Sequence, residues 1–221
     1  MSGWLAMVGG HEWTEGCRAI DEMLLKETGA KEVLVVPTAA AYEQPQKVVE
    51  AAAAYFGDLG VKVKTLDVLN RPAATDKANV KAVKGAKLVY FGDGSPLHLR
   101  SVFKDTPVWD ALVATWNDGA AVAGTGAGAM VLGDPMVDPR GGAFTLGLGL
   151  VPAMAAMTKT HDWHHETKRR TIQLATKDVP LVAVDDATAV MRSPAGKWSV
   201  AGVGAATVYL NGDEVSLSRL P

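Results

Sequence analysis

The 221-residue sequence has very little cysteine and no surplus of charge of either sign. Its single cysteine, Cys17, has no partner for an intramolecular disulfide. Its 22 lysines and arginines are balanced by 24 aspartates and glutamates, so it lacks the basic excess with which proteins neutralise nucleic-acid phosphates. Nucleic acid is therefore not an expected partner.

Long apolar runs are also missing. The longest, residues 143–157, is shorter than the ~20 residues of a membrane helix and is interrupted by Gly147, Gly149 and Pro152. The opening Met1-Ser2-Gly3-Trp4 lacks the charged and apolar regions of a secretory signal. We therefore expect a cytoplasmic protein that makes no membrane contact.

Apolar material for a core is ample, because 48% of the residues are hydrophobic and 21% are charged. The length is compatible with one large domain over residues 1–221, against a prior of ~150 residues per domain. A homodimer is compatible with the sequence, but nothing in it fixes the oligomeric state.

Short β-branched runs alternate with helical segments along much of the chain. This alternation predicts an α/β fold, a three-layer sandwich with a mostly parallel sheet and helices on both faces. The last third carries short β-like runs and Asn211-Gly212, a strong hairpin signal, so antiparallel strands are expected near the C-terminus. The expected strands are 5–8, 32–37, 61–69, 87–91, 120–123, 181–184, 187–191, 198–203, 206–210 and 215–217, and the expected helices are 13–27, 44–59, 76–83 and 164–175.

A glycine-rich turn, residues 124–128, follows the strand at 120–123. It partly fits a dinucleotide-binding turn, but no strand-terminal acid for a ribose follows about 20 residues later. It also fits a nucleophile elbow, G-x-S-x-G, whose central residue has strained backbone angles and presents the nucleophile. Gly126, at the centre, accepts that strain but has no side chain. A tight turn without chemistry is the third interpretation.

Six segments in a fixed order form a further pattern. They are Met7-Val-Gly-Gly10, Val35-Val-Pro-Thr-Ala39, Tyr90-Phe-Gly-Asp-Gly94 with Leu97-His-Leu99, Gly124-Thr-Gly-Ala-Gly-Ala129, Asp162-Trp-His164 and Val184-Asp-Asp-Ala-Thr-Ala189. Together they resemble the cyanophycinase and dipeptidase E family of serine peptidases, which has a class I glutamine amidotransferase-like fold. The resemblance covers nearly the whole chain and departs from the family at the elbow, where Gly126 stands in place of the serine.

The resemblance implies a role for each catalytic position. Gly126 takes the place of the nucleophile, His164 that of the general base and Asp186 that of the carboxylate that orients the base. The backbone N–H groups of Ala127 and Gly94 would form the oxyanion hole. A triad without its nucleophile retains only ~10³–10⁴-fold catalysis over water.

Substrate contacts are implied in the same way, at Ser95, Asp162, Lys168 and Arg170. The family's glutamine falls at Ser95 or Pro96, so one positioning amide is missing. Lys168 and Arg170 partly match an arginine-rich run and would bind a substrate carboxylate, although they fit a solvated helix face equally well.

The sequence therefore predicts a peptidase homologue that is inactive or impaired, a pseudoenzyme, with no cofactor and a pocket for a small acidic or isoaspartyl-type peptide or an amino acid. The alternative is an active hydrolase of small peptides or amides whose nucleophile is Ser95 or a metal-bound water. Thr125 is expected to point into the protein. Cys17 is expected to be a small buried hydrophobe, although a helix start can also lower a thiol pKa.

A metal site can be drawn within the histidine-rich run 160–166. At helical spacing His161 and His165 share one face, as do Asp162 and Glu166. The run lacks a metal motif such as H-E-x-x-H, and one base-like histidine with exposed neighbours is the favoured interpretation, so no metal ligand is assigned.

Overall fold

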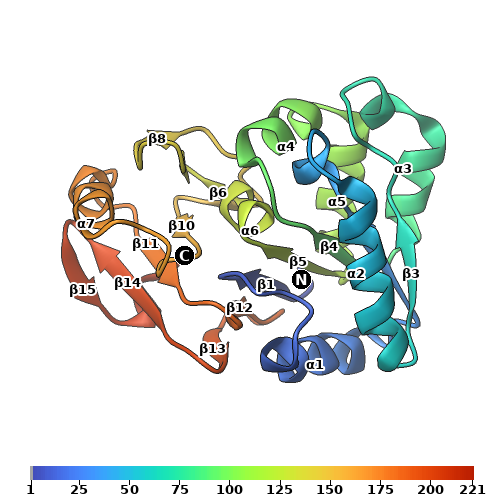
Figure 1. The fold of residues 1–221 in the computed structure, drawn as a ribbon, viewed down its shortest axis with the longest axis horizontal. Coiled ribbons are helices and arrows are strands. Elements are labelled where there is room, and N and C mark those ends of the chain that lie inside the picture. Colours follow the sequence, from blue (N-terminus) through green and yellow to red (C-terminus); the bar gives the residue numbers. More distant parts are fainter. Residues whose placement is uncertain (1) are drawn as a thin grey trace.

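The computed structural model describes residues 2–221 and is built around a seven-stranded sheet in the order β13-β12-β1-β5-β4-β2-β3 (Figure 1). The strands from β1 to β3 in this order are parallel, and β12 and β13 add antiparallel pairs at one side. The mostly parallel sheet predicted from the sequence is confirmed. The strands are β1 (Leu5–Val8), β2 (Glu32–Val36), β3 (Lys62–Thr65), β4 (Leu88–Phe91), β5 (Ala121–Thr125), β12 (Thr188–Arg192) and β13 (Trp198–Gly202).

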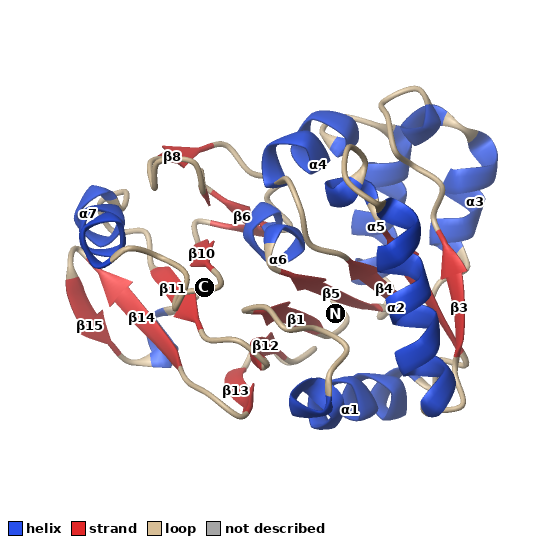
Figure 2. Ribbon diagram, in the orientation of Figure 1, coloured by secondary structure: helices blue, strands red, loops and turns tan. Residues whose placement is uncertain are grey.

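Helices cover both faces of this sheet, as the alternation of elements predicts (Figure 2). Successive side chains of a strand point to opposite faces. Leu5 and Met7 of β1 therefore join the core beneath α3, α4, α5 and α6, whereas Ala6 and Val8 join the core beneath α1 and α2. These helices are α1 (Arg18–Thr28), α2 (Pro45–Asp58), α3 (Lys77–Lys84), α4 (Pro96–Phe103), α5 (Pro107–Asn117) and α6 (Ala127–Leu132).

A second, four-stranded sheet in the order β10-β11-β14-β15 carries most of the C-terminal region, beside α7 (His165–Leu174). The hairpin predicted at Asn211-Gly212 joins its last two strands, and both turn residues have positive φ, 55° and 93°. One hydrophobic cluster includes buried residues of both sheets. The four strands are β10 (Ala155–Met157), β11 (Leu181–Val184), β14 (Ala206–Leu210) and β15 (Asp213–Val215).

Four two-residue strands, β6 (Gly133–Asp134), β7 (Met136–Val137), β8 (Phe144–Thr145) and β9 (Val151–Pro152), link the two sheets along the chain. Among residues 2–221, no helix has the length and apolar character needed to cross a bilayer.

The first helix begins later than the sequence predicts. His11 and Trp13 have positive φ, 51° and 55°, so the chain leaves β1 in a tight non-helical turn. A 3-10 turn, η1 (Glu15–Cys17), follows, and α1 begins only at Arg18. This turn lies at the carboxyl end of the central strand β1, which is where ligands bind in open α/β sheets.

Candidate functional site

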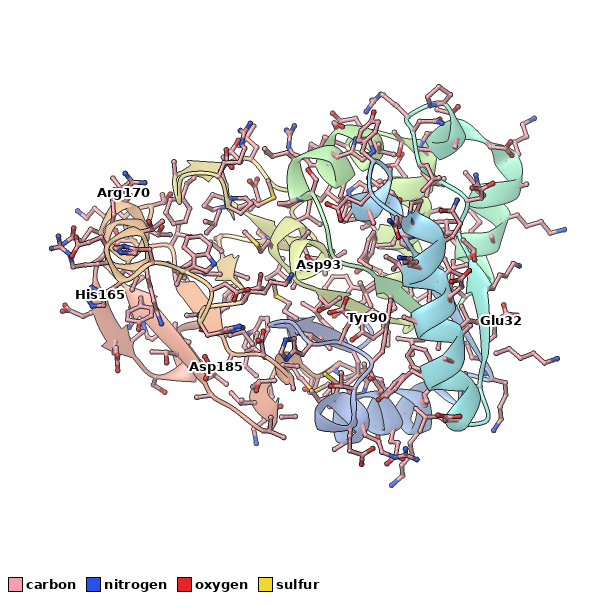
Figure 3. The ribbon with its side chains drawn as sticks, viewed as in Figure 1. Glu32, Tyr90, Asp93, His165, Arg170 and Asp185 are labelled. Carbon is pink, nitrogen blue, oxygen red and sulfur yellow. The ribbon has the colours of Figure 1, made fainter. Side chains whose placement is uncertain are left out.

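The carboxyl ends of the adjacent strands β1, β5 and β4 meet at one edge of the sheet. The turns that follow them are residues 9–13, Gly126 and residues 92–95. Parallel strands bring their carboxyl ends together, so three loops far apart in sequence converge on one place. Asp93 lies near the middle of the molecule, between the main sheet and the C-terminal sheet (Figure 3).

The turn between β5 and α6 has the strained backbone of a nucleophile elbow. Gly126 has φ 51° and ψ −117°, and its N–H donates to the Val8 carbonyl at 3.1 Å. The flanking glycines leave no room for side chains. A Cβ at Gly124 would lie 2.5 Å from the Gly128 carbonyl oxygen, and one at Gly128 would lie 2.5 Å from the Phe91 carbonyl oxygen. The elbow conformation is therefore held by backbone packing rather than by a side chain at position 126.

The Asp93 carboxylate fills the space in which a side chain at position 126 would lie. A Cβ on Gly126 would be 2.9 Å from Asp93 Oδ2 and closer still to Oδ1 and Cγ. The Ala127 N–H, expected to belong to the oxyanion hole, donates to Asp93 Oδ1 at 2.7 Å. Lys159 Nζ forms an ion pair with Asp93 Oδ2. Burial lowers the pKa of Lys159, but the ion pair outweighs burial and holds this pKa above its ordinary value.

A second carboxyl group lies close to this ion pair. Glu12, from the turn after β1, accepts a hydrogen bond from Thr125 Oγ1 at 3.1 Å. Burial raises the pKa of Glu12, and the negative charge of Asp93 raises it further. Thr125 is fully buried, which confirms that its hydroxyl points into the protein.

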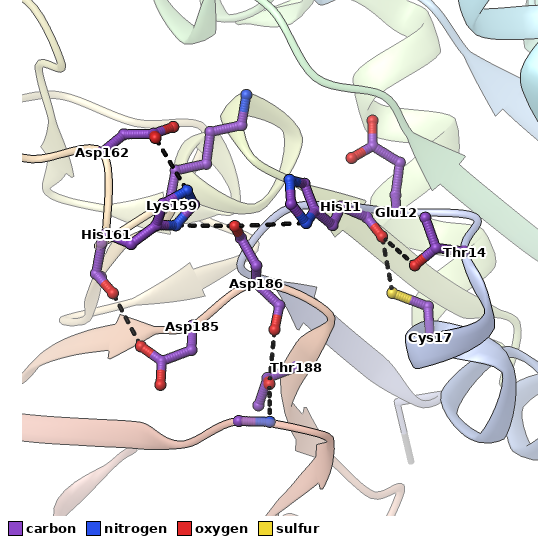
Figure 4. Close-up of polar contacts among 12 residues, drawn as sticks. His11, Glu12, Thr14, Cys17, Lys159, His161, Asp162, Asp185, Asp186 and Thr188 are labelled. Carbon is purple, nitrogen blue, oxygen red and sulfur yellow. Dashed lines mark hydrogen bonds and ion pairs between the residues drawn. The ribbon is translucent and has the colours of Figure 1, made fainter.

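Asp186 is paired with His161 in this structure, and not with His164. His161 Nδ1 lies 2.8 Å from Asp186 Oδ2, and His161 Nε2 lies 2.9 Å from Asp162 Oδ1 (Figure 4). His11 Nδ1 approaches the same Asp186 oxygen at 3.7 Å. His164 is an exposed residue immediately before α7. The structure therefore does contain a histidine–carboxylate pair at the expected carboxylate, formed by a different histidine of the same run.

A cavity of about 850 Å³ opens beside the elbow. Ala127 and Gly94, the two expected oxyanion-hole residues, both line it, together with Asp93 and Lys159. Gly94 has φ 138°, and a Cβ there would clash with the backbone of Ala39. The wall also includes Tyr42, Glu43, Lys47, Met130 and Trp163.

None of the four expected substrate contacts lines this cavity. Asp162 pairs with His161 instead. Ser95 caps α4, where its Oγ accepts the His98 N–H at 3.2 Å. Lys168 and Arg170 lie on α7, and the Arg170 guanidinium donates to the Gly141 carbonyl. Arg170 lies at the outer edge of the molecule, well away from Asp93 (Figure 3).

The other candidate groups are separated by the fold. His165 is 86% exposed and approaches Glu166 at 3.8 Å, while His161, with which it would share a face in the metal site that can be drawn, is turned toward Asp186. Within residues 2–221, no three His, Cys, Asp or Glu side chains are grouped so as to hold a metal ion. Cys17 is buried, and burial raises its thiol pKa to about 11, opposite to the lowering that a reactive thiol needs.

Sequence reasoning assigned no role to Glu12, Asp93 or Lys159. Asp93 did carry a signal, because it is an acid between two glycines at the carboxyl end of a predicted strand. Lys159 carried none. It reaches the elbow from a residue with φ 52°, whose N–H donates to the Gly9 carbonyl at 2.7 Å, and such a conformation is not visible in a sequence pattern.

Comparison with known proteins agrees with this architecture. Residues 5–195 match the sequence profile of Peptidase family S51. The chain is 26% identical over 216 residues to a cyanophycinase from Nostoc sp., covering 91% of this chain and 72% of that protein. It is 24% identical to a cyanophycinase from Synechococcus elongatus, covering 93% and 67%.

Two solved structures are also similar. A peptidase from an acI-B1 Actinobacterium superposes with a TM-score of 0.86 at 27% identity, over 97% of this chain and 93% of that one. A putative Peptidase E protein from Listeria monocytogenes has a TM-score of 0.70 at 16% identity, over 92% of this chain and the whole of that one, which supports the fold alone.

Proposed function

The chain belongs to peptidase family S51, and on that premise we propose that it binds a small peptide or amino acid in the cavity beside its elbow without forming an acyl-enzyme. The observation that carries this proposal is Gly126. Acyl transfer by a triad requires a hydroxyl or thiol at the elbow, and this chain has an elbow conformation with no side chain at its centre.

Three other side chains considered as nucleophiles, those of Thr125, Ser95 and Cys17, support the same conclusion. Thr125 is buried and donates to Glu12. The Ser95 Oγ caps α4, and Cys17 is buried with a raised pKa. A hydrolase that attacks through Ser95 would have to release this cap, which typically contributes about 1 kcal/mol to helix stability.

The ligand class we propose is a small acidic or isoaspartyl-type peptide. Pockets for small molecules are typically ~300–1,000 Å³, so 850 Å³ has room for a dipeptide. Charged side chains of both signs line the wall, namely the cations Lys47 and Lys159 and the anions Glu43 and Asp93. Such a lining suits a zwitterion that also carries a side-chain carboxylate.

Binding without turnover is the expected result for a panel of Asp-X, isoaspartyl and β-Asp-Arg dipeptides. Calorimetry should give saturable binding, while amine release over many hours should stay at the buffer rate. Lys47→Ala should weaken binding roughly tenfold, because it removes one charge-assisted contact with a ligand carboxylate.

Lys81→Ala is the matched control, since Lys81 is an exposed cation on α3 that does not line the cavity. It should bind the panel as the unmodified chain does. Turnover of any dipeptide by the purified chain would contradict the proposal. A Ser95→Ala variant would then show whether Ser95 is the nucleophile.

A further inference from the structure

The Asp93 carboxylate lies at the position from which a triad enzyme presents its nucleophile, and it faces the cavity. We propose that this carboxylate anchors an ammonium group of the ligand, and that Lys159 Nζ is the resident ammonium which the ligand displaces. The inference rests on the proposed function for the identity of the ligand, an amino acid or small peptide with a free amino group. The anchoring contact itself is a property of Asp93 and Lys159.

The two partners of this ion pair are held very differently. Asp93 has a short side chain that is 22% exposed, packs against Gly126 and accepts the Ala127 N–H at 2.7 Å. Lys159 has four rotatable side-chain bonds and is 41% exposed. Moving Asp93 breaks two interactions and empties the elbow, whereas moving Lys159 breaks one and lets the ammonium reach solvent. The lysine is therefore the exchangeable partner.

The surroundings of Lys159 Nζ favour a cation. Besides Asp93, the carboxyl groups of Glu12 and Asp162 contribute negative potential there, and both act to raise the pKa of Lys159. A ligand ammonium that replaces the lysine makes the same ion pair in the same field. The displaced Lys159 then remains in the cavity wall, where its charge is complementary to the carboxylate of a zwitterionic ligand.

The geometry of Asp93 suits this role. Its carboxylate accepts the Ala127 N–H and pairs with the Lys159 ammonium, so two contacts from different segments hold it in place. These contacts make it a fixed anion. A fixed anion in a cavity wall binds and orients a cation.

Chemical rescue of a truncated lysine tests the anchoring contact directly. Lys159→Ala leaves Asp93 unpaired beside a space that matches n-propylammonium. Adding n-propylammonium at ten times its dissociation constant should raise the melting temperature of this variant by about 3–5 °C. Neutral 1-propanol should give no comparable rise, and neither should n-propylammonium added to Lys159→Ala combined with Asp93→Asn.

Lys159→Gly allows the same test if Lys159→Ala folds poorly. Lys159→Gly suits the positive φ at this position and leaves space for n-butylammonium, so it should show the same rescue. Equal stabilisation by amine and alcohol, or rescue that persists with Asp93→Asn, would overturn the proposal. Absence of rescue in both lysine variants would do the same.

The unmodified chain tests whether the ligand uses this contact. N-acetylation of a dipeptide that binds should weaken its binding about tenfold or more, because the amide nitrogen carries no charge. Equal affinity of the free and acetylated dipeptides would overturn the inference while leaving the proposed function intact. Rescue by alkylammonium with no dipeptide binding would sustain the ammonium site and overturn the proposed function.

Discussion

Gly126→Ser alone is expected to destabilise the protein and to leave it without peptidase turnover. The new side chain must enter space that the Asp93 carboxylate fills, and the residue must keep a positive φ. Overpacking of this kind costs about 1–3 kcal/mol, and left-handed strain adds roughly 1 kcal/mol. Thermal unfolding should show a melting temperature lower by about 5–10 °C.

Asp93→Gly should remove most of that penalty. In the double variant Asp93→Gly with Gly126→Ser, the serine has space and the Ala127 N–H is released from Asp93 to act in an oxyanion hole. Labelling by a fluorophosphonate is expected in this double variant and not in the serine variant alone. Dipeptide binding should be weaker in the double variant, because Asp93 no longer anchors the ammonium group.

A double-mutant cycle shows whether the volume or the charge of the Asp93 side chain causes the destabilisation by Gly126→Ser. Asp93→Asn keeps the volume of the side chain and removes its charge, so Gly126→Ser should remain as costly with asparagine at position 93 as with aspartate. The cost of backbone strain for serine at position 126 is the same whichever residue is at position 93, so it cancels when the serine penalties are compared between backgrounds. A serine penalty that is the same in the Asp93→Gly background as with the native aspartate would show that the two positions do not share space.

The second large effect is a loss of stability as the pH rises from the ordinary carboxyl pKa of 3.8 to about 7, caused by Asp21. This carboxyl is fully buried in α1, and burial raises its pKa to about 7, although a hydrogen bond from Tyr55 at 2.9 Å acts in the opposite direction. At low pH the folded and unfolded chains both carry the proton. Above the ordinary pKa of 3.8 the unfolded chain loses it first, so stability falls until the folded carboxyl also ionises near pH 7.

Asp21→Asn should abolish this contribution. Between pH 5 and 7 the contribution of Asp21 should lower the free energy of unfolding of the unmodified chain by about 2–3 kcal/mol. The melting temperature of the unmodified chain should therefore fall by roughly 5–10 °C more than that of the asparagine variant. Glu22→Gln removes the same charge from an exposed neighbour on α1 and should not change the pH dependence. A constant difference between the unmodified chain and Asp21→Asn at pH 5 and pH 7.5 would contradict the assignment.

The architecture was predictable because it depends on short-range patterns in the sequence. Alternating β-branched and helical segments give the parallel sheet, and Asn211-Gly212 gives the last hairpin, since both depend on neighbouring residues. The elbow conformation could be predicted from glycine spacing for the same reason. Backbone clashes at Gly124 and Gly128 explain why the spacing matters.

The composition of the site was less predictable because it depends on how distant loops meet. The contact between Asp93 and Gly126 joins the ends of two strands, and Lys159 reaches it from a third segment. The histidine beside Asp186 depends on where the chain turns after Lys159, and not on motif order within residues 161–164. Sequence spacing identified the run that contains His161 but could not determine which ring faces the carboxylate.

The space shared by residues 93 and 126 also constrains how this chain can change over generations. A serine at the elbow is harmful while the aspartate is present, whereas shortening residue 93 first opens the space. The two substitutions are therefore epistatic, and their order matters. A serine therefore fits the elbow only where the side chain at position 93 is shorter or turned aside, and the effect of a substitution at either position depends on the residue at the other.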